Sequence, residues 1–265
     1  MRCPIVTLTT DFGLKDSYVA EMKAVILGIS PKATIVDITH QIEKFNVTLA
    51  AYVLASASPY FPDSTVHVAV VDPGVGTKRQ PIIVQTKKGC LVGPDNGVLA
   101  LAAKNIGGAI HIYGITNREL MLPKVSNTFH GRDIFAPAAA HLANGRSPAE
   151  FGPEIQQMMS PEFARIVKRK DALEGQVIYI DDFGNIITNF TEKELETTKT
   201  EGKLNVKVGN TELTVKLCKA YGNVEKQQPL AIIGSHNFLE ISVNQGSAAN
   251  VFNMKVGDKV LIYRS

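Results

Sequence analysis

Three polar loops, each directly after an apolar run, carry the residues of this 265-residue chain whose types suit chemistry. The loops are TTDFG at residues 9–13, VDPGVG at residues 71–76 and TFHGRD at residues 128–133. In an open α/β sheet, ligands bind beyond the carboxyl ends of the strands, so residues just after a strand face the ligand. The three loops therefore mark a candidate ligand site that is supplied with Asp, Arg and His.

The second loop offers a carboxylate and a guanidinium group close together, because Asp72 directly follows an apolar run and Arg79 lies a few residues on. A guanidinium group beside a carboxylate favours the ionised carboxylate and forms a fixed hydrogen-bonding fork. The loop lacks the GxxxxGK[ST] spacing of a phosphate-binding loop. Its Asp-Pro-Gly sequence is also typical of an ordinary tight turn that has no further function.

The first and third loops add carboxylates and an imidazole. Asp11 and Asp16 flank the start of a predicted helix, where a carboxylate suits ribose hydroxyls or an ammonium group but is also a common helix cap. His130 precedes another predicted helix, whose positive dipole end disfavours a second positive charge, so we expect a neutral imidazole at pH 7. A lone His is more often structural than catalytic.

The second half of the chain offers a different set of polar groups. Asp182, Phe183 and Asn185 follow a predicted strand, and an Asn beside an aromatic ring can recognise a purine edge, although the same residues equally suit a hairpin turn. Ser235 follows another apolar run and could donate to a carboxylate. The candidate loops are acidic, with Arg79 as the main cation, so they favour a hydroxyl-rich, positively charged ligand over a polyphosphate.

The elements that position these loops change in character along the chain. Up to about residue 160, short β-branched runs alternate with helical stretches, which predicts an α/β domain with a mainly parallel sheet. We expect an α/β domain over residues 1–165. Its predicted strands are 5–8, 34–38, 66–71, 82–85 and 109–113, and its predicted helices are 16–27, 47–56, 97–103 and 133–143.

Beyond a polar stretch at residues 161–173 that looks helical, short strands alternate with Asn- and Gly-rich turns. This pattern predicts a smaller C-terminal domain, an antiparallel β-barrel over residues 175–265, with a linker at residues 166–174. Its predicted strands are 176–180, 203–208, 212–217, 230–233, 238–243 and 259–263.

Composition narrows the class of protein. The net charge is +3 and the basic residues are scattered, so nucleic acid is not an expected partner. No apolar run reaches the roughly 20 residues that span a bilayer, and no secretion signal is evident, so we expect no membrane contact and a cytoplasmic location. The three cysteines form no CxxC or Cys/His cluster, and no metal site is expected.

Five motifs together resemble the S-adenosyl-L-methionine (SAM) hydroxide adenosyltransferases, which are relatives of the enzymes that fluorinate and chlorinate the same substrate. The motifs are TTDFG followed by Asp16, VVDPGVG followed by Arg79, NTFHGRDIFAP, DDFGN, and SHNFLEISVNQGSAA. They occur in the family's order and cover nearly the whole chain. The resemblance implies an N-terminal α/β domain, a C-terminal β-barrel, and a homotrimer or dimer of trimers whose active sites lie between subunits.

The resemblance also implies a reaction: water or hydroxide displaces methionine from the ribose C5′ of SAM and releases adenosine, without a cofactor. In the hydrolytic members an Asp-Arg-His set holds the water, and Asp72, Arg79 and His130 occupy those positions. The implied binding roles are the ribose diol for Asp11, the methionine end for Asp16, Ser235 and Asp182, and adenine for Phe183 and Asn185.

The chain departs from the halogenating relatives at the nucleophile site. Those enzymes have Tyr where this chain has Asp72, and the fluorinating enzyme has Ser where it has Gly131; both differences favour water. At His236 the fluorinating relatives have Arg, which leaves a carboxylate contact there open. The alternatives to a hydrolase are a halogenase of the same family, a non-catalytic SAM or adenosine sensor, and a metal phosphoesterase.

Overall fold

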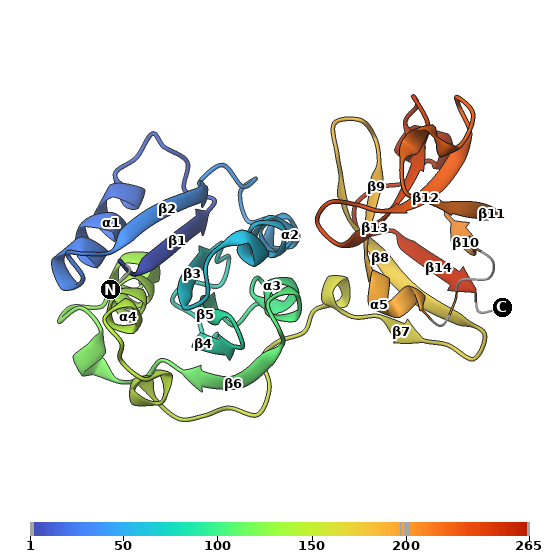
Figure 1. Cartoon of the computed structure of the whole chain (residues 1–265). Coiled ribbons are helices and arrows are strands. Elements are labelled where there is room, and N and C mark those ends of the chain that lie inside the picture. Colours follow the sequence, from blue (N-terminus) through green and yellow to red (C-terminus); the bar gives the residue numbers. More distant parts are fainter. Residues whose placement is uncertain (1–2, 197, 199–201, 264–265) are drawn as a thin grey trace. The chain divides into compact units, whose positions relative to one another are not determined.

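The computed structural model of the chain describes residues 3–196, 198 and 202–263 (Figure 1). Its contacts divide the chain into an N-terminal unit, Met1–Ser160, and a C-terminal unit, Pro161–Ser265. Each unit has its own hydrophobic core and is described by itself.

The N-terminal unit is built on a six-stranded sheet in the order β2-β1-β3-β5-β4-β6. The neighbours β2, β1, β3 and β5 are parallel, and β4 is antiparallel to both β5 and β6. The predicted α/β fold with a mainly parallel sheet is therefore confirmed. The strands are β1 (Ile5–Thr10), β2 (Thr34–Thr39), β3 (Thr65–Val70), β4 (Pro81–Thr86), β5 (Gly89–Pro94) and β6 (Ala109–Gly114).

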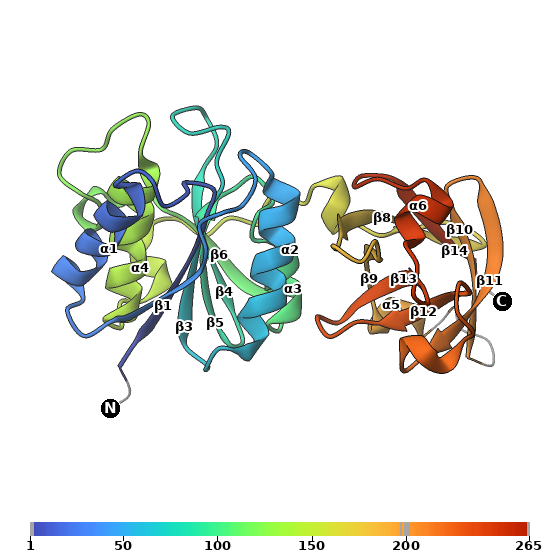
Figure 2. The same cartoon turned by 90° about the horizontal axis from the view of Figure 1, so that it is seen from above.

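Helices cover both faces of this sheet. Figure 2 shows α1 (Tyr18–Ile29) and α4 (Ala136–Ala143) on one face, and α2 (Val47–Ala57) and α3 (Ala100–Asn105) on the other. The space between the sheet and helices α1 and α4 is filled by fully buried apolar side chains, among them Leu8, Met22, Ile26 and Phe135. Short helical turns lie at Ser58–Tyr60, Arg118–Leu120, Gly131–Phe135 and Pro148–Phe151.

The C-terminal unit is a β-barrel. Seven of its strands close a ring through the pairing of β14 with β8, and all of their pairings are antiparallel except β11 with β12. The predicted barrel is confirmed. Its elements are β7 (Val167–Lys168), which extends the sheet beside β8, then β8 (Ala172–Ile180), β9 (Ile186–Thr191), α5 (Glu192–Leu195), β10 (Lys203–Val208), β11 (Thr211–Cys218), β12 (Pro229–Ile233), β13 (Phe238–Val243), α6 (Ala248–Phe252) and β14 (Lys259–Tyr263), with short helical turns at Glu162–Ala164 and Tyr221–Asn223.

The helix expected over residues 161–173 is wrong. Only a single helical turn, Glu162–Ala164, forms there, and it is followed by β7 and the start of β8. Val167 and Lys168 instead pair antiparallel with Glu174 and Leu173 of β8, so their backbone takes part in the sheet. The expected linker, 166–174, thus contains β7 and the first residues of β8. Within the residues described, no helix is both long and apolar enough to cross a membrane.

Candidate active site

The carboxyl ends of the neighbouring strands β1 and β3 meet at a cavity of about 430 Å³. Asp11 follows β1 and Asp72 follows β3 after one further residue, so the parallel pairing brings both carboxylates to the same edge of the sheet. His130 reaches this cavity from the loop before α4, which packs on β3. The lining residues are Asp11, Phe12, Asp16, Tyr18, Lys44, Phe45, Val70, Asp72, Val75, Thr128, Phe129, His130 and Gly131.

Asp72 and Arg79 form a buried, forked ion pair. Arg79 Nε lies 3.0 Å from Oδ1 and 2.9 Å from Oδ2 of Asp72, and Nη2 also donates to Oδ2. The two side chains are only 5% and 9% exposed, so solvent screens their attraction little. Successive turns, closed by hydrogen bonds from Val75 N–H to Asp72 C=O and from Thr77 N–H to Gly74 C=O, return the chain so that Arg79 faces Asp72.

His130 is held by the same guanidinium group. Arg79 Nη2 lies 2.8 Å from His130 Nδ1. Because a guanidinium group only donates, Nδ1 must accept, and the proton of the neutral imidazole then resides on Nε2. Burial, and after it the charge of Arg79, lowers the pKa of His130. The geometry and the pKa shift both describe a neutral His130, so its Nε2 can donate a hydrogen bond but its Nδ1 cannot accept a proton while Arg79 holds it.

Gly76 allows the Asp72 loop to lie directly against the His130 loop. Gly76 has φ +75°, and a Cβ added there would lie 2.3 Å from the backbone oxygen of Asn127. Only glycine combines this left-handed backbone with so close an approach. From the other side, Asn96 Nδ2 donates to the C=O of Val71 at 2.8 Å. The positions of Asp72 and His130 are therefore fixed by neighbouring backbone as well as by Arg79.

Asp11 is anchored by the loop that follows β2. Its carboxylate accepts a hydrogen bond of 2.9 Å from Phe45 N–H, and its backbone C=O accepts one from Lys44 Nζ. Asp11 is 6% exposed. The N-cap position of α1 belongs to Ser17, so Asp11 is not a helix cap. Asp16 is exposed and lines the cavity.

Several cavity residues were not predicted from the sequence. Lys44 and Phe45 lie in the loop between β2 and α2, five and six residues beyond the end of β2, so the rule that selects residues just after a strand does not reach them. Phe45 is 68% exposed and has a left-handed backbone, with φ 65°, which no sequence signal indicates for a Phe. Phe12, Tyr18 and Phe129 form an aromatic cluster at the cavity, with ring centroids 5.1 to 5.8 Å apart.

The other predicted binding residues belong to the C-terminal unit. Asp181 organises their turn, because its carboxylate accepts from the backbone N–H of Phe183 at 3.0 Å and of Asn185 at 2.8 Å, and from Asn185 Nδ2 at 2.8 Å. This turn holds the Phe183 ring outward, 80% exposed, while Asn185 is only 7% exposed. Asp182 is exposed in the same turn. Ser235 is exposed between β12 and β13.

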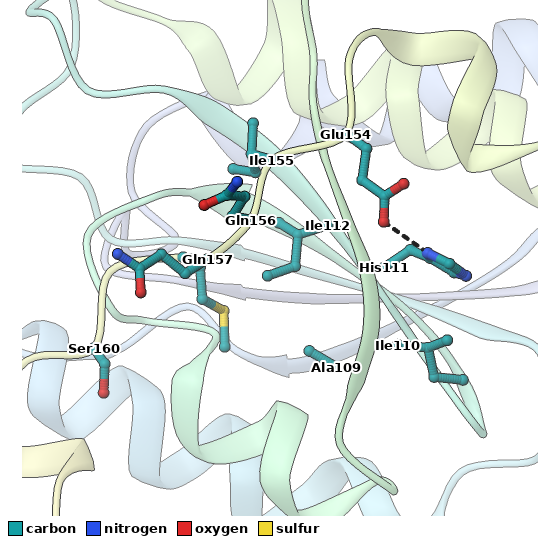
Figure 3. A pocket seen from close by; sticks show the side chains of 10 residues that line it. Ala109, Ile110, His111, Ile112, Glu154, Ile155, Gln156, Gln157 and Ser160 are labelled. Carbon is teal, nitrogen blue, oxygen red and sulfur yellow. Dashed lines mark hydrogen bonds and ion pairs between the residues drawn. The ribbon is translucent and has the colours of Figure 1, made fainter.

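A larger cavity, of about 600 Å³, lies along the edge strand β6 (Figure 3). It is lined by β6 and by residues 154–158 and 160, and its titratable side chains are His111 and Glu154, whose Nδ1 and Oε1 atoms lie 2.7 Å apart. None of the predicted site residues lines it. Size alone therefore does not identify the active site; the convergence of Asp11, Asp72 and His130 does.

An α/β unit with a polar cluster beyond its parallel strands, joined in one chain to a β-barrel unit, has the architecture of an enzyme that acts on a small molecule. The family model described as the SAM hydroxide adenosyltransferase N-terminal domain matches residues 6–152, and that of the C-terminal domain matches residues 175–261. The chain belongs to the SAM hydroxide adenosyltransferase family.

Individual relatives agree with this family. The (R)-S-adenosyl-L-methionine hydrolase of Methanocaldococcus jannaschii is 39% identical, over 97% of this chain and 95% of its own. The protein of the same name from Salinispora tropica is 36% identical, over 98% and 97%. A crystal structure of an uncharacterized conserved protein from Thermotoga maritima is 42% identical with a TM-score of 0.80, covering 98% of this chain and 100% of its own. A fluorinase from Actinopolyspora mzabensis is more distant, at 26% identity over 99% and 98%.

Proposed function

We propose that this protein hydrolyses SAM to adenosine and L-methionine, with water attacking the ribose C5′. The observation that carries the proposal is the Asp72–Arg79–His130 cluster, in which Asp72 and His130 line the same cavity as Asp11 while Arg79 holds them from behind. The membership of the chain in the SAM hydroxide adenosyltransferase family, together with relatives named SAM hydrolases, supplies the substrate.

The energetics favour positioning of water over formation of free hydroxide. Water has a pKa near 15.7, so free hydroxide at pH 7 would cost about 12 kcal/mol at 1.36 kcal/mol per pKa unit. The sulfonium of SAM leaves as neutral methionine, so a full hydroxide is not required. Holding water in line with C5′ can contribute about 7–11 kcal/mol in favourable cases. The reaction needs no cofactor, because the substrate carries its own leaving group.

Each member of the cluster has a distinct task in this mechanism. Asp72, paired with Arg79, accepts a hydrogen bond from the attacking water and takes its proton as the O–C5′ bond forms and the C5′–S bond breaks. His130 donates from Nε2 and fixes the orientation of the water, since Arg79 occupies its Nδ1. Arg79 holds Asp72 and His130 in position by donating a hydrogen bond to each.

The remaining residues bind the substrate. Asp11 accepts from the ribose diol, and Asp16 pairs with the ammonium group of the methionine end. Phe183 packs against adenine, and Asn185 hydrogen-bonds to the edge of the base. Ser235 and Asp182 contact the methionine end. The exposed ring of Phe183 supports such a role, because an 80% exposed aromatic side chain on an ordered turn is available to a ligand.

We further propose that the protein is a homotrimer or a dimer of trimers with active sites between subunits, and that it works in the cytoplasm. The assembly follows from the family resemblance, which assigns the two groups of binding residues to different subunits. The three cysteines, all free, support a reducing compartment. The scattered basic residues and net charge of +3 support a small molecule, and not nucleic acid, as the partner.

A halogenase and a SAM sensor receive less support. The forked pairing of Asp72 with Arg79 offers a bound water an acceptor, whereas a halide at the same place would meet a carboxylate. A Cβ at Gly131 would already lie 3.2 Å from the Phe129 ring, so the small residue is matched to its surroundings. No feature of the described residues favours a ligand-holding role without turnover.

Product analysis tests the proposal. The purified protein is incubated with SAM, with and without added chloride, beside an Arg79→Ala variant, and the products are separated by chromatography. We expect adenosine and methionine in equal amounts, lost in the variant and unaffected by chloride. A chlorinated nucleoside would indicate a halogenase, and intact SAM after long incubation would indicate a sensor.

A further inference from the structure

We propose that His40, which lies outside the cavity lining, is a positioning residue for Asp11. It acts through a series of polar contacts that runs from a surface ion pair to the loop after β1, in which the link between His40 and Thr10 is a hydrogen bond. The kinetic part of this inference rests on the proposed SAM hydrolysis, whereas its structural part does not. The relevant residues are Lys23, Asp37, His40 and Thr10.

His40 is a buried histidine with a polar neighbour near each ring nitrogen. It is 3% exposed; its Nε2 lies 3.1 Å from Asp37 Oδ1, and its Nδ1 lies 2.9 Å from Thr10 Oγ1. The Asp37 carboxylate lies near Nε2 without completing a hydrogen bond, and its negative charge favours the ring proton on that nitrogen, so Nδ1 accepts from the Thr10 hydroxyl.

Thr10 links His40 to the loop that carries Asp11. Its Oγ1 accepts a hydrogen bond of 3.2 Å from Phe12 N–H, on the far side of Asp11. The backbone of His40 adds a second tie, because its C=O accepts from Gly13 N–H at 2.7 Å. Asp11 therefore sits between two residues, Thr10 and Phe12, whose positions depend on His40.

Asp37, at the surface end of this series of contacts, is itself held in place. Lys23 Nζ, from α1, donates to Asp37 Oδ2 at 2.6 Å, while Asp37 Oδ1 faces His40. Burial alone would raise the pKa of Asp37, but the interactions with Lys23 and His40 outweigh it and lower that pKa. Asp37 thus places a negative charge beside Nε2 of His40, which favours one tautomer of the ring.

The same sheet contains a matched pair without any link to the loop. His67 is also 3% exposed, and its Nδ1 lies 2.8 Å from Oγ1 of Thr7. Thr7 is in the middle of β1, whereas Thr10 is its last residue. A purely structural role predicts equal consequences from breaking either pair. A positioning role predicts consequences for the site only from breaking the pair of His40 and Thr10.

The experiment compares Thr10→Val with Thr7→Val, which remove only the hydroxyl, and adds His40→Leu and His40→Asn. We expect Thr10→Val and His40→Leu to raise the KM for SAM about tenfold while kcat changes less than about twofold. We expect Thr7→Val to leave both parameters unchanged. His40→Asn, whose amide oxygen can replace Nδ1 as the acceptor, should restore most of the wild-type KM.

A second readout does not depend on activity. Amide hydrogen exchange of the ligand-free protein should be faster at Phe12, Gly13 and Phe45 in Thr10→Val than in Thr7→Val. In an Asp11→Ala background, Thr10→Val should add no further change in KM, because its effect passes through Asp11.

The two readouts separate the possible failures. Equal exchange at these amides in Thr10→Val and Thr7→Val would overturn the positioning role, as would an additive effect on KM in the Asp11→Ala background. If the wild-type protein left SAM intact but exchange still increased in Thr10→Val alone, the proposed reaction would be wrong while the support of the loop by His40 stood.

Discussion

Arg79 Nη2 lies 2.8 Å from Nδ1 of His130, and this contact determines which chemistry His130 can perform. The guanidinium group can only donate, so it holds the imidazole neutral with its proton on Nε2. The same Arg79 holds the Asp72 carboxylate through Nε. One cation thus orients both an acceptor and a donor at the cavity where β1 and β3 end.

Arg79→Ala should lower kcat far more than it raises KM. The substitution removes the group that orients both Asp72 and His130, and loss of such preorganised polar groups typically lowers kcat about 10²- to 10³-fold. Arg79→Lys is the matched variant, because it keeps the charge but loses the fork and should recover little activity. Steady-state kinetics measures both parameters; a rise in KM as large as the fall in kcat would contradict the division of roles.

Asp11→Ala should have the opposite signature. The carboxylate binds hydroxyl groups in substrate and transition state alike, so its loss should raise KM about 10- to 100-fold with a smaller change in kcat, which corresponds to about 1.5–3 kcal/mol for a charged hydrogen bond. Isothermal calorimetry with SAM and the Arg79→Ala protein as a non-hydrolysing reference measures the affinity separately. Unchanged affinity in an Asp11→Ala/Arg79→Ala double variant would remove Asp11 from the binding site.

The pH profile should report on His130. Burial and the charge of Arg79 lower its pKa below the ordinary value of 6.5, so the neutral form persists when the pH drops below 6.5. We expect kcat/KM to be constant through pH 6.5 and to fall only as the pH passes the lowered pKa, where protonation at Nδ1 would oppose Arg79. His130→Asn should lack this acid limb. A limb centred above pH 6.5 would mean that His130 is charged in the active protein.

Gly76→Ala should weaken both stability and turnover. The left-handed backbone costs an Ala about 1–2 kcal/mol, and the Cβ would also meet Asn127 O at 2.3 Å and push the Asp72 loop away from the His130 loop. Gly145→Ala is the control, because Gly145 has φ +89° with no atom within 4 Å of the added Cβ. Urea denaturation and kcat should show the larger loss in Gly76→Ala; equal losses would mean that the contact with Asn127 is unimportant.

The sequence predicted the fold class because strand and helix periodicities are local. Three strands were nevertheless missed: β5, β9 and the short β7, which lies in the stretch expected to be helical. The apolar centre of β5 is enclosed by Gly89, Gly93 and Pro94, which look like turn residues, and β9 carries Thr188 and Asn189 within its apolar run. Pairing with neighbouring strands makes these segments β-structure, and a single sequence does not contain that information.

Site residues could be predicted from the sequence where a reactive side chain comes just after a strand, as at Asp11 and Asp72. Two kinds of information were missing. The left-handed backbone of Phe45 follows from the hydrogen bond between its N–H and Asp11, which is a tertiary contact. The link from His40 to the loop after β1 joins segments 30 residues apart, so the lone His in the sequence carried no sign of it.

The central claim is that water attacks C5′ of SAM, and an isotope experiment tests it most directly. The reaction is run in ¹⁸O-labelled water and the products are analysed by mass spectrometry. We predict one ¹⁸O atom in adenosine, at its 5′-hydroxyl group, and unlabelled methionine. Label in homoserine together with methylthioadenosine would show attack at the other side of the sulfonium, and would contradict the assignment of this cavity to the ribose C5′.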